Sequence, residues 1–269
     1  MKKTKIITIS SGKGGTGKSL VAANLSAILA QNGYKTALFE VSDLPNLDII
    51  INAKSGLGLS NFLNSQCEFE DIFDEIKPNL FFVQTSGSEF GKFANEGVTK
   101  DLFANFKESG IFDFVIVDCA SGASKSVQNC IKSSDENIIV TLSEPAAISD
   151  AYAMIKLGCE FKNDFLFIVN FAKNEEEAVL IFENLKKVAT NNIKKPLNLN
   201  LLGFIKKSSV VPICAKERSL ICEEFEYSDP SINLQQIASR LLGKVGFKGL
   251  DIKKLKGIKG FINKLSNLV

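Results

Sequence analysis

The chain has 269 residues, of which 45% are hydrophobic and 23% are charged, which is ordinary usage for a globular protein and excludes a disordered or fibrous one. Its six cysteines form no CxxC pair and it has no histidine, so neither a zinc site nor an iron–sulfur cluster is expected. It contains no apolar run long enough to cross a bilayer and no cleavable leader pattern, so we expect a cytoplasmic protein.

The predicted elements alternate along the chain, with short β-branched and aromatic runs followed by segments of helical length. This alternation predicts an α/β fold with a mostly parallel sheet and helices on both faces. Residues 1–243 are predicted to form this domain. Strands are predicted at 5–10, 36–41, 80–85, 114–118, 137–142, 165–170 and 201–204, and helices at 18–31, 99–108, 125–133, 146–159, 175–190 and 232–242.

The first predicted strand is followed by GKGGTGKS, Gly12 to Ser19, which matches the GxxxxGK[ST] phosphate-binding motif. Glycines there let backbone N–H groups close around phosphate oxygens at the start of a helix. Lys18 would contact the outer phosphates and Ser19 would bind Mg²⁺. The alternative is a glycine-rich turn without a ligand. The predicted ATP- or ADP-binding residues of this loop are Gly12, Lys13, Gly14, Gly15, Thr16, Gly17, Lys18, Ser19 and Leu20.

A second acidic position follows another predicted strand. In FDFVIVDCASG, four apolar residues precede Asp118. A carboxylate at the end of a strand next to the loop would complete the Mg²⁺ site, so Asp118 is the candidate Walker B residue and Gly122 a place where the backbone can approach the γ-phosphate. By itself the pattern fits equally well an ordinary buried strand that ends in a turn aspartate.

The motif holds a second lysine, Lys13, where the loop faces outward. Here the sequence resembles the MinD/ParA family of P-loop ATPases, whose deviant Walker A motif carries such a signature lysine. The resemblance implies that two subunits enclose two ATP molecules and that each Lys13 reaches the nucleotide of the other subunit. The alternative is a solvated surface lysine.

The second half of the chain resembles one branch of that family, the flagellar-number regulators called FlhG, FleN or YlxH. The resemblance lies in VTLSEPAAISDAYAMIK (140–156), FIVNFAKNEEEAVLIFENL and LNLLGFIKKSSVVPICAKERSL. It implies that Asn170 recognises adenine and that the partners are flagellar assembly proteins: an FlhF-type GTPase, and basal-body or regulator proteins. From the residues alone, Asn170 is an amide at the end of a strand, a place where α/β sheets bind ligands.

One stretch departs from the family pattern. Relatives carry DxD before NLD, but this chain reads FEVSDLPNLD, with Glu40 and Ser42 at the aspartate positions. A serine hydroxyl cannot act as an ionised acceptor that orients water. Asp43 is the residue that would substitute. We therefore expect an ATPase whose hydrolysis is slow or partner-stimulated, with Lys13, Lys18, Asp43 and Asp118 as its catalytic residues.

The C-terminal end is basic: seven lysines against one aspartate follow Gly243, within a net charge of +2, so the rest of the chain is net negative. Residues 244–250 are predicted as a linker and 251–269 as an amphipathic helix that binds an anionic membrane surface. The alternative is a helix packed on its own domain. The apolar stripe that would enter the membrane comprises Leu255, Ile258, Phe261, Ile262, Leu265 and Val269.

The leading hypothesis is an ATP-dependent homodimer, peripheral at the inner face of the cell membrane or its poles, that sets flagellar number or placement. The alternatives are a MinD-like regulator of the cell-division site, a ParA-type segregation ATPase and a nucleotide-binding scaffold without hydrolysis. The acidic body argues against nucleic acid as a specific partner.

Overall fold

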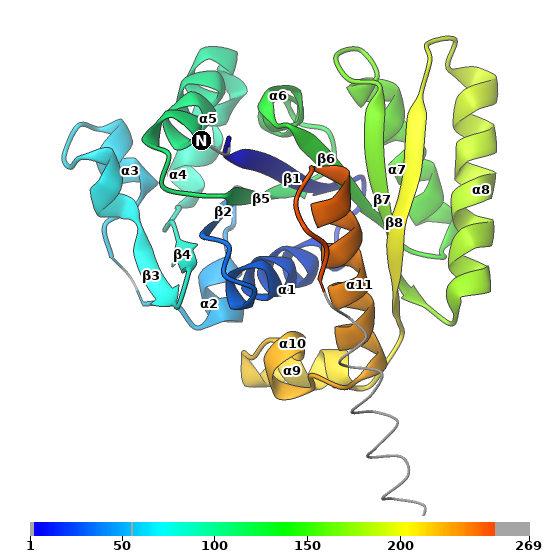
Figure 1. The fold of residues 1–269 in the computed structure, drawn as a ribbon. Helices are drawn as coiled ribbons and strands as arrows, with labels where there is room; N and C mark the ends of the chain where they lie inside the picture. Colours follow the sequence, from blue (N-terminus) through cyan, green and yellow to red (C-terminus); the bar gives the residue numbers. More distant parts are fainter. Residues whose placement is uncertain (1–2, 55, 251–269) are drawn as a thin grey trace, which may run out of the picture.

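The computed structural model describes residues 3–54 and 56–250 (Figure 1). Their centre is an eight-stranded sheet in the order β3-β4-β2-β5-β1-β6-β7-β8, in which all pairs are parallel except β3 with β4. This confirms the predicted α/β class. The strands are β1 (Lys5–Ser11), β2 (Thr36–Val41), β3 (Asp74–Lys77), β4 (Leu80–Phe82), β5 (Phe114–Ser121), β6 (Glu136–Thr141), β7 (Asp164–Ala172) and β8 (Asn198–Lys206).

Helices cover both faces of the sheet, as expected for parallel strands joined by crossovers. The helices are α1 (Lys18–Gln31), α2 (Leu47–Ile51), α3 (Leu59–Leu63), α4 (Gly87–Phe90), α5 (Glu96–Ser109), α6 (Lys125–Ser133), α7 (Pro145–Gly158), α8 (Glu175–Asn192), α9 (Val210–Glu217), α10 (Ile221–Glu224) and α11 (Asp229–Lys244), with 3₁₀ turns η1 (Phe69–Ile72) and η2 (Lys92–Ala94).

The core has two main layers, one on each face of the sheet. Alternate residues of β5 show this: Phe114 and Ile116 belong to the layer under α1, α2, α9, α10 and α11, while Val115 and Val117 belong to the layer under α3, α5, α6, α7 and α8. Figure 1 shows α1 and α11 together on the first face. Both faces of the central strands are buried, which explains their nearly continuous apolar runs.

The structure extends the predicted elements at several places. The polar edge strand β3 and the short helices α2, α3, α4, α9 and α10 were not predicted, because segments of four to eight residues carry little periodic signal. Strand β4 ends at Phe82, earlier than the predicted position 85, whereas β5 continues beyond Asp118 to Ser121 and β8 extends beyond 201–204 at both ends.

The segment predicted as a linker, 244–250, packs on the body. Helix α11 continues through Gly243 to Lys244, and the ring of Phe247 then lies 4.7 Å from Phe114 and 5.5 Å from Tyr34, measured between centroids. The amide of Leu250 donates a 3.0 Å hydrogen bond to Ser239 on α11. The predicted membrane-binding helix, with its stripe Leu255, Ile258, Phe261, Ile262, Leu265 and Val269, lies outside the described residues.

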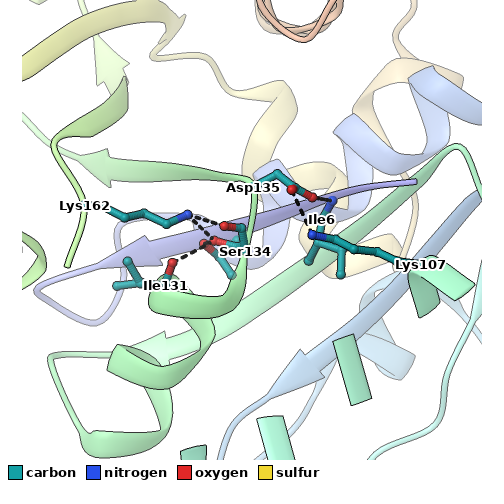
Figure 2. Close-up of polar contacts among 7 residues, drawn as sticks. Ile6, Lys107, Ile131, Ser134, Asp135 and Lys162 are labelled. Atoms are coloured by element: carbon teal, nitrogen blue, oxygen red, sulfur yellow. Dashed lines mark hydrogen bonds and ion pairs between the residues drawn. The ribbon is translucent and has the colours of Figure 1, made fainter. Parts of the chain in front are cut away.

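An ionic cluster closes the amino-terminal edge of the sheet (Figure 2). Asp135, just before β6, accepts hydrogen bonds from the Lys107 ammonium and from the Ile6 amide, both at 2.8 Å. The ammonium of Lys162, just before β7, donates to the carbonyl and hydroxyl oxygens of Ser134. Burial lowers the pKa of Lys162 to about 8, partly offset by the nearby Asp135.

Candidate functional site

The loop between β1 and α1 lies at the carboxyl edge of the sheet. Gly15 and Gly17 adopt left-handed conformations, with φ of 78° and 85°, which side-chain-bearing residues rarely adopt. Gly17 precedes Lys18 as the N-cap of α1, and no side chain caps this end of the helix. The first amides of α1 are therefore available to an anion, and the helix dipole favours negative charge there.

Neighbouring elements press against this loop. A Cβ atom at Gly12 would lie 2.3 Å from the backbone oxygen of Asp150 on α7, and one at Gly17 would lie 2.2 Å from the Asn170 side-chain nitrogen. Only glycine fits at these two positions. Contacts on both sides hold the loop in its turned shape, so its amides are preorganised for a ligand.

Asn170 sits beneath the loop and is fully buried. Its Nδ2 donates a 2.8 Å hydrogen bond to the carbonyl of Thr16, and its Oδ1 accepts one from the amide of Phe171 at 2.9 Å. The amide of Asn170 thus supports the loop from below. That Asn170 recognises adenine stays a prediction.

Asp118 is the buried acid of the site. It pairs in register with Ile9 of β1 on one side and with Glu40 of β2 on the other. Its Oδ1 has no hydrogen-bond partner among the described residues, and the hydroxyl of Ser19 lies close enough to the carboxylate to favour its ionised form. Burial raises the pKa of Asp118 to about 7, although Lys18 and Ser19 favour the ionised form.

That unpartnered oxygen fits a divalent cation. A buried carboxylate oxygen normally has a partner, and one without a partner next to a hydroxyl presents two hard oxygen ligands at a single point. Ser19 and Asp118, the two predicted metal ligands, are thus brought together by the fold. Among the described residues no cluster of three or more acidic, cysteine or histidine side chains could hold a metal alone, so waters and a ligand would have to supply the remaining positions.

The ammonium of Lys18 bonds to a residue that the sequence did not indicate. Its Nζ donates a 3.1 Å hydrogen bond to the hydroxyl of Ser121, the last residue of β5. Sequence reasoning ended this strand at Asp118 and so missed Ser121. The available signal was Gly122, whose left-handed φ of 84° ends the strand beside the loop.

Glu40, near the end of β2, uses its carboxylate to bind backbone amides. Glu40 Oε2 accepts hydrogen bonds from the amides of Asn46 and Leu47 at 2.8 and 2.9 Å, which caps α2. Burial raises the pKa of Glu40, opposed by these amides, by Lys18 and by Ser42. Asp43, predicted to be catalytic, is exposed and forms no hydrogen bond or ion pair with any residue that the structure describes.

Lys13 faces outward, as predicted, but it has a partner in the same chain. Its ammonium lies 3.0 Å from Glu144 Oε2, the residue that precedes α7, and the two side chains are 40% and 60% exposed. Such an exposed pair contributes at most about 1 kcal/mol. Lys13 can therefore leave Glu144 at little cost when a stronger anion is presented.

A cavity of about 660 Å³ adjoins the loop. Phe171 forms part of its wall, and the edge of this ring lies 3.8 Å from where a Cβ atom of Gly17 would be. Glu144 and Lys207 add charged groups, while Leu142, Val211 and Pro212 supply apolar surface. Leu20, predicted to bind the nucleotide, lines a separate cavity of about 110 Å³ with residues of α2 and α9.

Within the described residues no helix combines the length and the apolar character required to span a membrane. All six cysteines have free thiols, and all but Cys67 are buried.

Comparisons with known proteins identify a family and relatives that this chain resembles. Residues 7–221 match the family model described as the CobQ/CobB/MinD/ParA nucleotide binding domain. The chain is 35% identical to the flagellum site-determining protein YlxH of Helicobacter pylori, over 97% of this chain and 90% of that protein. It is 26% identical to the antiactivator FleN of Pseudomonas aeruginosa, over 90% of this chain and 87% of that protein.

The fold is also that of a solved structure, the septum site-determining protein MinD of Pyrococcus horikoshii in complex with Mg-ADP. The TM-score is 0.73 at 23% sequence identity, and the match covers 88% of this chain and 96% of that one. At this identity the likeness establishes the fold.

Proposed function

The chain belongs to the CobQ/CobB/MinD/ParA family of nucleotide-binding proteins, and on that premise we propose that it is an ATP-driven switch that pairs into a homodimer, associates reversibly with the membrane and controls the number or placement of flagella. The observation that carries the nucleotide part is the buried Asp118 carboxylate, with one unpartnered oxygen, beside Ser19 and Lys18 at the glycine loop.

The residues divide the work of binding Mg·ATP. The loop amides and Lys18 would hold the phosphates, and Ser19 and Asp118 would hold Mg²⁺. When bound, Mg²⁺ would neutralise negative charge on the outer phosphates. The cavity beside Phe171 adjoins the loop and is large enough to take the nucleoside. Asn170 keeps the loop closed from below.

Hydrolysis is proposed to be slow or to depend on a partner. Orienting the attacking water calls for a carboxylate or amide near the outer phosphate. Glu40 accepts hydrogen bonds from two backbone amides, Ser42 carries no carboxylate, and Asp43 lies exposed. The same observation supports a second candidate, a nucleotide-binding scaffold without turnover. A phosphate-release assay separates the two, because a scaffold releases no phosphate above a Lys18→Ala control.

Pairing is proposed to proceed through Lys13. A partner's triphosphate carries far more negative charge than Glu144, so it can displace that carboxylate from the Lys13 ammonium. The test is size-exclusion chromatography with light scattering in ADP, in ATP and without nucleotide. We expect a dimer only with ATP, and a monomer throughout for Lys13→Ala. A wild-type monomer in saturating Mg·ATP would contradict the switch.

The flagellar role rests on the names of the relatives, a flagellum site-determining protein and an antiactivator. The proposed partners, an FlhF-type GTPase and basal-body or regulator proteins, follow from the same resemblance. Placement of the division site is the alternative, since MinD proteins share the fold. Deleting the gene in its own host and counting flagella and minicells distinguishes the two: a change in flagella with normal division supports the proposal.

Membrane association is assigned to residues 251–269, whose sequence alternates lysines with an apolar stripe. Each of these lysines near an anionic leaflet contributes roughly 1 kcal/mol, so a dimer with two tails binds far better than a monomer. Removing Asp251 to Val269 should abolish ATP-dependent sedimentation with anionic liposomes. Undiminished sedimentation would refute the assignment.

A further inference from the structure

Ser121 occupies a fixed place between the glycine loop and Asp118. It pairs in register with Ser11 at the end of β1, and the next amide, that of Gly122, donates a 2.8 Å hydrogen bond to the Ser11 carbonyl. The chain turns at Gly122. The backbone at Ser121 is thus tied to the strand that leads into the loop.

The hydroxyl points to the place where phosphates would bind. It accepts the hydrogen bond from Lys18 Nζ at 3.1 Å, and a Cβ atom at Gly14 would lie 3.8 Å from it, so it stands against the loop as well. The side chain is exposed. A hydroxyl that accepts from an ammonium still has its own hydrogen to donate, and among the described residues no acceptor takes it.

The outer phosphate is the acceptor that matches this position. In a loop of this type the backbone amides surround the inner phosphates, and the lysine reaches the outer ones. Ser121 touches that lysine and follows Asp118 by three residues on the same strand. On the segment after β2, the hydroxyl of Ser42 lies beside Glu40 and accepts a 3.3 Å hydrogen bond from the Leu44 amide, whereas the hydroxyl of Ser121 is the one that contacts Lys18.

We propose that Ser121 is a specificity-determining residue for the triphosphate: its hydroxyl donates to a γ-phosphate oxygen and so favours ATP over ADP. The inference rests on the proposed function and adds to it the group that distinguishes bound ATP from bound ADP. A charge-assisted hydrogen bond of this kind corresponds to roughly a ten-fold change in affinity.

The test compares two affinities in one protein. Binding of a non-hydrolysable ATP analogue and of ADP, each with Mg²⁺, is measured by calorimetry on the full chain in a Lys13→Ala background, so that pairing does not contribute. Ser121→Ala should weaken the analogue roughly ten-fold and leave ADP within about two-fold. Ser121→Thr, which keeps the hydroxyl, should retain the preference. Ser60→Ala, a half-exposed serine of α3 outside the site, is the matched control.

The outcomes separate the two claims. Equal weakening of both nucleotides, no weakening of either, or a Ser121→Thr protein that behaves like Ser121→Ala would overturn the role of Ser121 while nucleotide binding stands. Retained ADP affinity also shows that the variant is folded. Failure of the unmodified chain to bind either nucleotide would instead overturn the proposed function.

Discussion

The two edges of the parallel sheet hold ionic clusters of opposite character. At the amino edge, both oxygens of Asp135 are used, one by Lys107 and one by the Ile6 amide. At the carboxyl edge, Asp118 is more deeply buried, and one of its oxygens has no partner among the described residues. A carboxylate whose oxygens all have partners stabilises the fold. A buried carboxylate with an unpartnered oxygen instead indicates a site where a ligand binds.

The first and largest prediction applies one substitution to both edges. Asp118→Asn should weaken Mg·ATP binding at least about 100-fold, because it removes a charged Mg²⁺ ligand. Asp135→Asn should leave this affinity unchanged, because its carboxylate lies at the far edge and serves only structure. Calorimetry with the ATP analogue and Mg²⁺ measures both. Similar losses at the two positions would remove the distinction between the edges.

The second prediction is that Asp118→Asn and Asp135→Asn change the free energy of unfolding in opposite directions. The folded pKa of Asp118, about 7, lies above its ordinary 3.8, so its favourable contribution is complete below 3.8 and is lost as pH rises through about 7. At pH 8 without nucleotide, Asp118→Asn should therefore raise the free energy of unfolding by roughly 2–4 kcal/mol. Asp135→Asn should lower it by roughly 1–3 kcal/mol. Urea unfolding checks the signs.

The third prediction concerns the pH dependence of Mg·ATP binding. Mg²⁺ requires the ionised Asp118 carboxylate, whose fraction falls roughly ten-fold from pH 8 to pH 6 when the pKa is about 7. Affinity should fall by a similar factor over this range. The control is Asp118→Asn, which retains only the titration of the nucleotide itself. A wild-type protein with the same pH profile as this variant would contradict the assignment.

A smaller effect is expected at the amino edge. The folded pKa of Lys162, about 8, lies below its ordinary 10.5, so the unfolded chain holds this proton more tightly and stability from this group rises as pH increases from 8 to 10.5. The gain should be roughly 1–2 kcal/mol by pH 10. Urea unfolding of Lys162→Met against wild type measures it. An unchanged pH dependence in the variant would show that Lys162 is not the group responsible.

The smallest effect is predicted where the carboxyl edge meets solvent. Glu144→Gln removes the intrachain partner of Lys13, so the ATP concentration for half-maximal pairing should fall, by no more than about five-fold. Light scattering across an ATP titration measures this shift. Glu160→Gln, which removes a similarly exposed ion pair with Lys195 on another surface, is the matched control and should leave the midpoint unchanged. An equal shift in both variants would contradict a specific role of Glu144.

Much of this protein could be predicted from the chain alone, because the informative patterns are local. The glycine loop, Lys18 and Ser19 are consecutive in sequence and form one motif. The long apolar strands predict a sheet that is buried on both faces. Short polar elements such as β3 and α10 carry no such pattern. Residues 244–250 were predicted to be a linker because their glycines break a helix, whereas the packing of Phe247 on Phe114 depends on the tertiary structure.

By itself, the sequence determined the fold class and the presence of a phosphate-binding loop, since both depend on spacing along one stretch of chain. Only the tertiary structure decided which groups meet: that Asn170 supports the loop, that Glu40 caps α2, that Lys13 pairs with Glu144 and that Ser121 touches Lys18. These contacts join residues that adjacent strands or packed loops bring together. The strength of these contacts depends on how deeply the groups are buried and on the geometry of their hydrogen bonds, and neither can be inferred from a local sequence pattern.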